Sequence, residues 1–163
     1  MSRVLVAYAT KHGATREIAE AIAEEIRAVG HDVDCAPAEQ AGEVEGYDAV
    51  VLGSAVYMKR WRKPARRLLA RNHDALSERP LWIFSSGPCG ADPDPSWSEP
   101  PKIVGEVERL GAKDHVIFGG RLPVEPSSFI EKAMVKNTPP EQRDLRDWQQ
   151  IRSWAARIGA QTP

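Results

Sequence analysis

The chain has 163 residues, of which 42% are hydrophobic and 28% charged, and its formal net charge is −1. This size and composition predict one soluble globular domain over residues 1–163. No apolar run approaches the ~20 residues of a membrane span. Two cysteines are too few for a disulfide framework, and no cysteine or histidine cluster indicates a metal site. The N-terminus enters a predicted strand without a secretory leader, so we expect a cytoplasmic protein.

Strands are predicted where short apolar runs recur, at Val4–Ala9, Ala49–Leu52, Leu81–Phe84 and Val116–Phe118. Their continuous apolarity is typical of strands in a parallel sheet that is covered on both faces. His31–Cys35 alternates between apolar and polar residues instead, which predicts a half-exposed edge strand.

Helical stretches separate these runs. The first has an apolar stripe at helical spacing, formed by Ile18, Ile22, Ile26 and Val29, and Gly30 ends it. Further helices are predicted over Arg62–Leu76, Lys102–Leu110, Ser127–Lys136 and Asp144–Gly159. Ser86–Pro101 holds five prolines and two glycines and is expected to be a long surface loop. The alternation of strands and helices predicts a doubly wound α/β domain.

The segment Thr10–Thr15 (TKHGAT) joins the first strand to the first helix and is strongly polar. In an open α/β sheet, ligands bind beyond the carboxyl ends of the strands. Backbone N–H groups and the helix dipole make a helix N-terminus there an anion site, and Gly13 would let the backbone approach the anion. The segment has neither the GK[ST] ending of a triphosphate loop nor GxGxxG, so it predicts a site for a small terminal phosphate. In the alternative interpretation, Thr10 and Thr15 are only helix caps.

Thr10–Thr15 resembles the phosphate loop of the flavodoxin family. Gly53–Tyr57 (GSAVY) resembles that family's first flavin-ring loop, and Ser85–Gly90 (SSGPCG) is placed like its second. Within the family, the likeness is closest to the menaquinone-dependent protoporphyrinogen oxidase branch, in which segments similar to GSAVYMKRW, FGGRL and DLRDWQQIRSWAARI recur in similar order. The resemblance implies a flavodoxin-like domain with five parallel strands in the order 2-1-3-4-5. It also implies FMN, bound without a covalent link.

The resemblance further implies which residues contact FMN. These are Thr10, Lys11, His12, Gly13, Ala14, Thr15, Ser54, Ala55, Val56, Tyr57, Ser85, Ser86, Gly87, Pro88, Cys89 and Gly90. Tyr57 is expected to stack on the flavin ring, and Trp61 either covers the flavin edge or packs its helix. No side chain is expected to be a decisive general acid or base, because the flavin carries out the redox chemistry.

Seven basic residues and no acidic residue lie between Met58 and Arg71, whereas the rest of the chain has 15 basic and 23 acidic residues. This asymmetry indicates a local anionic partner, although such a run is also typical of a solvated helix face. No nucleic-acid partner is expected. Four of the seven follow the first ring loop directly and are the expected substrate contacts: Lys59, Arg60, Arg62 and Lys63.

The resemblance implies an FMN-dependent oxidoreductase similar to the quinone-dependent protoporphyrinogen IX oxidases of heme biosynthesis. It would act on an anionic, carboxylated substrate, with a quinone or a redox protein as electron acceptor. One alternative is an electron-carrier flavodoxin without its own substrate, and another is a flavin- or phosphate-binding module with regulatory or lost activity. The basic run favours the oxidase, because carriers of this family usually present acidic residues there. Pro123–Arg143 corresponds in position to an insertion of the oxidase branch, and peripheral contact with the inner face of a membrane stays open.

Overall fold

A computed structural model describes residues 1–87 and 100–163 of the chain. Strands and helices alternate along it, as the hydrophobic pattern predicts. The strands are β1 (Arg3–Ala9), β2 (Asp32–Pro37), β3 (Ala49–Tyr57), β4 (Arg60–Trp61), β5 (Leu81–Ser86) and β6 (Asp114–Phe118). The helices are α1 (Ala14–Ala28), α2 (Lys63–Arg71), α3 (His73–Ser77), α4 (Pro101–Leu110), α5 (Phe129–Lys136) and α6 (Trp148–Gln161). Two 3₁₀ turns, η1 (Ala38–Gln40) and η3 (Pro140–Gln142), complete the described elements.

Five parallel strands form the sheet in the order β2-β1-β3-β5-β6. The predicted order 2-1-3-4-5 is therefore confirmed, once the two-residue strand β4 is counted separately. β4 pairs antiparallel with the end of β3, through Val56 with Trp61 and Tyr57 with Arg60. The predicted edge strand is also confirmed, because β2 pairs with β1 alone.

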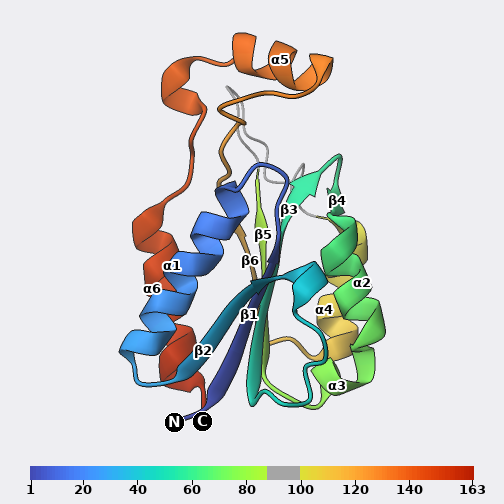
Figure 1. Cartoon of the computed structure of the whole chain (residues 1–163), viewed down its shortest axis with the longest axis vertical. Coiled ribbons are helices and arrows are strands. Elements are labelled where there is room, and N and C mark those ends of the chain that lie inside the picture. The colour runs from blue at the N-terminus through green and yellow to red at the C-terminus, as the bar shows by residue number, and fades with distance from the viewer. Residues whose placement is uncertain (88–99) are drawn as a thin grey trace.

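Helices cover both faces of the sheet (Figure 1). α1 and α6 lie on one face, and α2, α3 and α4 lie on the other. Each face has its own cluster of buried apolar residues, which is why the central strands are apolar without alternation. The sheet thus holds the carboxyl ends of β1, β3 and β5 side by side at one edge of the domain.

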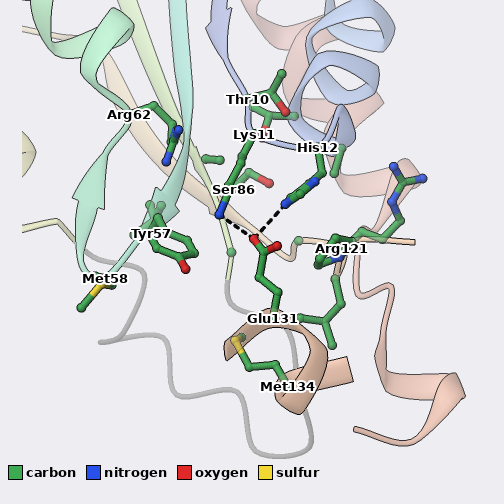
Figure 2. Close-up of a pocket in the computed structure, with 18 of the residues that line it drawn as sticks. Thr10, Lys11, His12, Tyr57, Met58, Arg62, Ser86, Arg121, Glu131 and Met134 are labelled. Carbon is green, nitrogen blue, oxygen red and sulfur yellow. Dashed lines mark hydrogen bonds and ion pairs between the residues drawn. The ribbon is translucent and has the colours of Figure 1, made fainter. Parts of the chain in front are cut away.

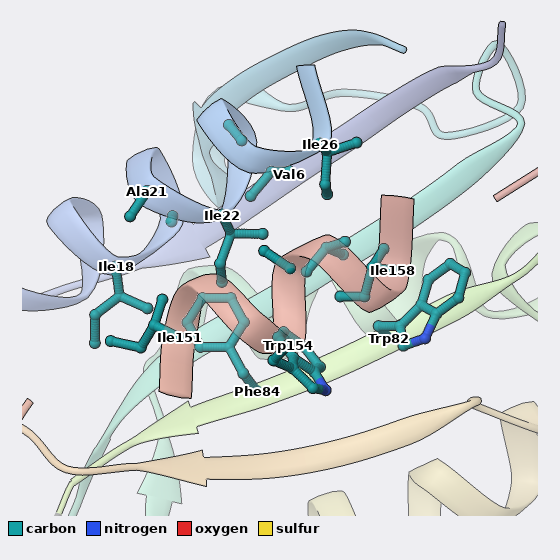
Figure 3. Close-up of a cluster of buried hydrophobic side chains, with 14 of the residues drawn as sticks. Val6, Ile18, Ala21, Ile22, Ile26, Trp82, Phe84, Ile151, Trp154 and Ile158 are labelled. Atoms are coloured by element: carbon teal, nitrogen blue, oxygen red, sulfur yellow. The ribbon is translucent and has the colours of Figure 1, made fainter. Parts of the chain in front are cut away.

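The core on the α1 face joins the two ends of the chain (Figure 3). Of the predicted stripe, Ile18, Ile22 and Ile26 are fully buried in this core, together with Ile151 of α6. Val29 follows α1 and is 50% exposed, so its place in the stripe is wrong. The Trp154 ring meets the Phe84 and Phe118 rings edge to face, at centroid distances of 6.2 and 5.5 Å. Gly53 fits under this group, since a Cβ atom there would lie 2.1 Å from the Phe84 ring.

Three predicted boundaries differ most from the structure. The predicted helix 62–76 is two helices, because Asn72 leaves helical geometry (φ −112°, ψ 22°) and its side-chain amide donates to the Leu68 carbonyl. The third strand continues to Tyr57 instead of ending at Leu52, because both β5 and β4 pair with the extension. The last helix begins at Trp148 instead of Asp144, since the Asp147 carboxylate caps it by accepting from the Gln150 N–H.

α5 lies beyond the carboxyl ends of the strands, outside the two helical layers (Figure 1). The chain leaves β6 along residues 119–122 and returns along residues 143–145. These two legs run antiparallel and exchange the Leu122 N–H to Arg143 O and Leu145 N–H to Gly120 O hydrogen bonds. Across residues 1–87 and 100–163, none of the helices has the length and apolarity to cross a bilayer.

Candidate functional site

A cavity of about 360 Å³ opens at the carboxyl ends of β1, β3 and β5. Its walls come from five segments that are far apart in the sequence: the β1–α1 loop, the end of β3 with its hairpin, the end of β5, residues 120–123 and α5. Both ring-loop segments that were predicted from the sequence contribute to it. The site thus lies where a doubly wound sheet is expected to bind its ligand.

The β1–α1 loop presents the N-terminus of α1 to this cavity. Gly13 is the N-cap residue of α1, at a φ of 88°, and no side chain caps the helix. The Thr10 hydroxyl accepts a 2.9 Å hydrogen bond from the Gly13 N–H and so holds the loop in shape. The cap interpretation of Thr10 and Thr15 is therefore wrong. The first turn of α1, with its free N–H groups and the positive end of the helix dipole, therefore borders the cavity.

Most of the predicted FMN contacts line the cavity together. Those on the wall are Thr10, Lys11, His12, Ala14, Thr15, Ala55, Val56, Tyr57, Ser86 and Gly87. Gly13, Ser54 and Ser85 do not lie on the wall, and Pro88, Cys89 and Gly90 lie outside the described residues. Three separate loops predicted from the sequence thus converge on one site.

Ser54 and Ser85 support the wall from behind it. The Ser54 hydroxyl accepts from the Arg62 N–H at 2.9 Å and so fixes the start of α2. The Ser85 hydroxyl accepts from the Trp61 indole Nε1–H at 2.8 Å. Trp61 is fully buried in the core of the α2 face, so of the two interpretations of this residue, core packing is correct.

The four predicted substrate contacts divide into two pairs. Lys59 and Arg62 line the cavity, whereas Arg60 and Lys63 are exposed beside it. Lys59 belongs to the β3–β4 hairpin, whose two central residues, Met58 and Lys59, both have positive φ. The cavity therefore has a basic rim on its β3–α2 side, although not all four basic residues reach it.

The sequence analysis missed the wall that the β6–α6 connection contributes. This wall consists of Gly120, Arg121, Leu122, Pro123, Ile130, Glu131 and Met134. The helix over residues 127–136 is expected, but nothing in its pattern directs it toward a loop more than 100 residues earlier. Ser128-x-x-Glu131 has the spacing of a capping box, a local role that gives no sign of a distant contact.

Glu131 is the ionisable group at the site whose pKa departs most from its ordinary value. Its side chain is 3% exposed, and one carboxylate oxygen, Oε2, lies 2.6 Å from Lys11 Nζ and 2.8 Å from His12 Nε2 (Figure 2). The other oxygen, Oε1, accepts from the Ser127 N–H and hydroxyl, both at 2.9 Å. The hydrogen bonds from Lys11 and then from His12 hold the pKa of Glu131 far below its ordinary value, although burial opposes them.

Lys11 also contacts the aromatic wall of the cavity. Its Nζ atom lies 4.5 Å from the centre of the Tyr57 ring, which is within the range of a cation–π interaction. Lys11 thus bridges the Tyr57 ring and the Glu131 carboxylate across the mouth of the site (Figure 2). The arrangement combines cations for an anionic group with an aromatic and apolar wall for a planar one.

Comparison with known proteins identifies this architecture. The family model described as a flavodoxin domain matches residues 5–144. Oxidised flavodoxin 1 from Bacillus cereus has a TM-score of 0.64 at 16% identity, over 99% of this chain and 100% of its own. A flavodoxin from the domain Archaea has a TM-score of 0.63 at 15% identity, over 98% of each chain.

A larger protein shares the fold in one part of its chain. Rubredoxin oxygen:oxidoreductase from Desulfovibrio gigas has a TM-score of 0.62 at 14% identity, over 97% of this chain and 36% of its own. No curated protein matches the sequence. The finer expectation of a protoporphyrinogen oxidase gains no support from these comparisons. The family match covers most of the residues and includes the three loops that meet at the cavity, so the chain belongs to the flavodoxin family.

Proposed function

We propose that the protein binds FMN in this cavity and transfers electrons between redox proteins. The observation that supports this function best is the uncapped N-terminus of α1, which opens into a cavity with an aromatic wall at the carboxyl ends of the strands. The flavodoxin family match supports the same cofactor. When bound, FMN supplies the redox chemistry, and the chain supplies position and electrostatics.

The residues of the site fit both ends of FMN. For the phosphate there are the first-turn N–H groups of α1, the buried Thr15 hydroxyl, and the Lys11 and His12 side chains. The structure contains a direct sign that these two side chains hold an anion, because they bind the Glu131 carboxylate. For the ring there are Tyr57 and Val56.

The basic rim determines which protein partner fits. Lys59 and Arg62 line the cavity, and Arg60 and Lys63 are exposed next to them. A partner that exchanges electrons at this edge is therefore expected to present acidic residues. Such complementarity mainly raises the association rate, which falls as salt screens the charges.

A second candidate is an oxidoreductase with its own carboxylated substrate, similar to the quinone-dependent protoporphyrinogen oxidases. The observation that favours it is the pair of rim cations that face into the cavity, Lys59 and Arg62. An arginine fork matches a carboxylate in both geometry and charge. In this function, Lys59 and Arg62 would orient a carboxylated donor over the ring, and a quinone would accept the electrons.

FMN binding is tested by titrating the protein with FMN and with riboflavin, which differ only in the phosphate. A charge-assisted hydrogen bond contributes about 1.5–3 kcal/mol, so several of them should favour FMN by roughly 100-fold or more. Flavin fluorescence measures both dissociation constants. Equal affinity for the two flavins would show that the α1 N-terminus does not bind the phosphate.

The two candidate functions are separated by reversing rim charges in Arg60→Glu/Arg62→Glu. Arg67→Glu/Arg71→Glu changes the charge equally on the exposed face of α2, away from the cavity, and is the matched control. In both functions, FMN affinity should change little. If the protein is a carrier, the Arg60→Glu/Arg62→Glu variant should transfer electrons to an acidic redox protein more slowly. The wild-type rate should then fall steeply as salt is added. If the protein is an oxidase, Arg60→Glu/Arg62→Glu should instead raise the KM for a porphyrinogen about tenfold or more. The wild type must then already oxidise the porphyrinogen with a quinone as electron acceptor.

A further inference from the structure

α5 meets the rest of the molecule through a charged residue. Of its eight residues, all of which the structure describes, Glu131 alone is buried. Phe129 is 87% exposed and Ile130 64% exposed, and Met134 is exposed as well. An amphipathic helix ordinarily buries its apolar side. Here the carboxylate faces the domain, and large apolar side chains remain exposed to solvent, so apolar burial does not account for the position of α5.

A role in helix capping accounts for only half of the Glu131 contacts. The Ser128 hydroxyl caps α5 by accepting from the Glu131 N–H at 3.1 Å. In return, Oε1 of Glu131 accepts from Ser127, so this oxygen is satisfied locally, much as in a capping box. Oε2 is not needed for the cap. It binds Lys11 and His12, which precede α1 in the chain.

The partners of Oε2, Lys11 and His12, are the side chains that the proposed FMN site offers to a phosphate. A phosphate at the α1 N-terminus would carry a charge of roughly −1.5 to −2. If it lay beside a buried carboxylate, the two anions would repel each other in a poorly solvated site. Arg121, the other cation in this wall, is already directed to Glu17 on α1, at 3.4 Å. Lys11 and His12 therefore cannot bind the Glu131 carboxylate and a phosphate equally well.

We propose that Glu131 is an internal occupant of the phosphate site, and that FMN binding exchanges its carboxylate for the FMN phosphate at Lys11 and His12. The proposal rests on the FMN function proposed above. In the flavin-free protein, Glu131 holds α5 against the cavity. When a phosphate binds Lys11 and His12 instead, α5 loses this contact, and Ile130 and Met134 are released from the cavity wall that they line in the flavin-free protein. Glu131 thereby lowers the affinity for FMN and couples the occupancy of the site to the position of α5.

The first test compares wild type with Glu131→Gln, which keeps the size of the side chain but removes its charge and replaces one of its two acceptor oxygens with an NH2 donor. Glu125→Gln, on an exposed residue that precedes α5, is the matched control. Glu131→Gln should bind FMN about tenfold more tightly, the scale of one charge-assisted hydrogen bond. Its affinity for riboflavin, which has no phosphate, should not change. A residue that merely obstructs the cavity would affect both flavins alike, so an equal gain for both would overturn the exchange. An unchanged or weaker FMN affinity would overturn it as well.

The second test uses the wild-type chain and does not require flavin binding. Amide hydrogen exchange of residues 129–136 is followed with and without inorganic phosphate at millimolar concentration. Phosphate should accelerate exchange in α5 of the wild type, because it competes with the Glu131 carboxylate for Lys11 and His12. It should have no such effect in Glu131→Gln, in which α5 already exchanges fast. Unchanged or slower exchange in the wild type would contradict the proposal.

The two tests distinguish the two proposals from each other. If neither the wild type nor Glu131→Gln binds FMN but phosphate still accelerates exchange in α5 of the wild type, the anion exchange stands and the FMN function fails. If the wild type and Glu131→Gln bind FMN with equal affinity and both prefer it to riboflavin, the FMN function stands and the exchange fails.

Discussion

Gly13 shows how one residue prepares the phosphate site. It lies at φ 88° and ψ −7°, where an L-residue is strained, and its N–H donates to the Thr10 hydroxyl. A Cβ atom at Gly13 would meet no other atom within 4 Å. From the sequence we expected this glycine to make room for an anion. The structure shows that the positive φ at this position itself favours glycine. With this backbone conformation, the start of α1 points toward the cavity.

Replacing Gly13 should therefore destabilise the protein through its backbone. We expect Gly13→Ala to lower the free energy of unfolding by about 1–2 kcal/mol, and the melting temperature by roughly 2–8 °C. Gly13→Asn should cost clearly less, because asparagine tolerates positive φ better than alanine. Thermal unfolding of the flavin-free variants measures both effects. Equal losses for alanine and asparagine would show that the positive φ is not the source of the cost.

At the scale of elements, the β3–β4 hairpin is strained where it borders the site. Met58 and Lys59 have φ angles of 52° and 62°, which correspond to a two-residue turn of type I′. This turn favours Asn-Gly, and neither methionine nor lysine adopts it readily. Both residues line the cavity. Strain that persists at a binding site is a sign that function maintains the residues there.

Relieving this strain should stabilise the protein. Met58 is 83% exposed, so Met58→Asn removes little buried surface and supplies a residue that accepts positive φ. We expect a gain of about 0.5–1 kcal/mol in the free energy of unfolding of the flavin-free protein, measured by urea denaturation. Val124→Asn is the control, because Val124 is 78% exposed but is not among the residues at positive φ. A gain of the same size in the control would assign the effect to surface polarity instead of the turn.

The sequence predicts the existence of these elements better than their ends. Continuous apolar runs identify four of the five parallel strands, because a strand buried on both faces has few polar positions. Alternation identifies the fifth, the edge strand β2. The hairpin after β3 depends on the pairing of β3 with β4, and no local sequence pattern predicts a turn at Met58 and Lys59. Likewise Asn72 divides α2 from α3 by donating to Leu68, and one asparagine in a helical pattern is a weak signal for such a break.

At the scale of the whole molecule, the sheet order follows from the sequence but the closure of the site does not. Alternating strands and helices with right-handed crossovers leave few topologies, and the flavodoxin resemblance selects one of them. That topology brings residues 10–15, 55–57 and 86–87 together. Glu131 is 119 positions away from His12, on a segment outside the two layers. Its contact depends on how the legs of residues 119–122 and 143–145 direct α5, which no periodicity encodes.

Arg146 connects these distant parts. Its side chain is 5% exposed and binds Asp144, in the return leg from α5, at 2.8 Å, and also Glu17 in the first turn of α1. The guanidinium also lies 4.8 Å from the centre of the Trp148 ring at the start of α6. One residue thus ties the helix of the phosphate loop to the connection that carries α5, across 129 positions of the chain.

The acid sensitivity of this connection gives a prediction for the whole molecule. Hydrogen bonds from Arg146 hold the pKa of Glu17 and the pKa of Asp144 below their ordinary values of 4.5 and 3.8. A carboxyl group whose folded-state pKa is lowered stabilises the protein above its unfolded pKa, and this contribution is lost as the pH falls through the folded value.

We therefore expect Arg146→Met to lower the melting temperature at pH 7, and the gap to the wild type to narrow progressively below about pH 4.5. Glu17 and Asp144 are partly exposed, so water can solvate them in the variant, and the loss at pH 7 should be about 1–2 kcal/mol, well short of that of a fully buried pair. Arg152→Met is the control, since Arg152 also pairs with α1, through Glu24 and Glu25, but at an exposed position. Thermal unfolding of the three proteins from pH 7 to pH 3 measures the gap. If it stays constant as the pH falls, Arg146 stabilises the fold by packing on Trp148 and not through its carboxylate partners.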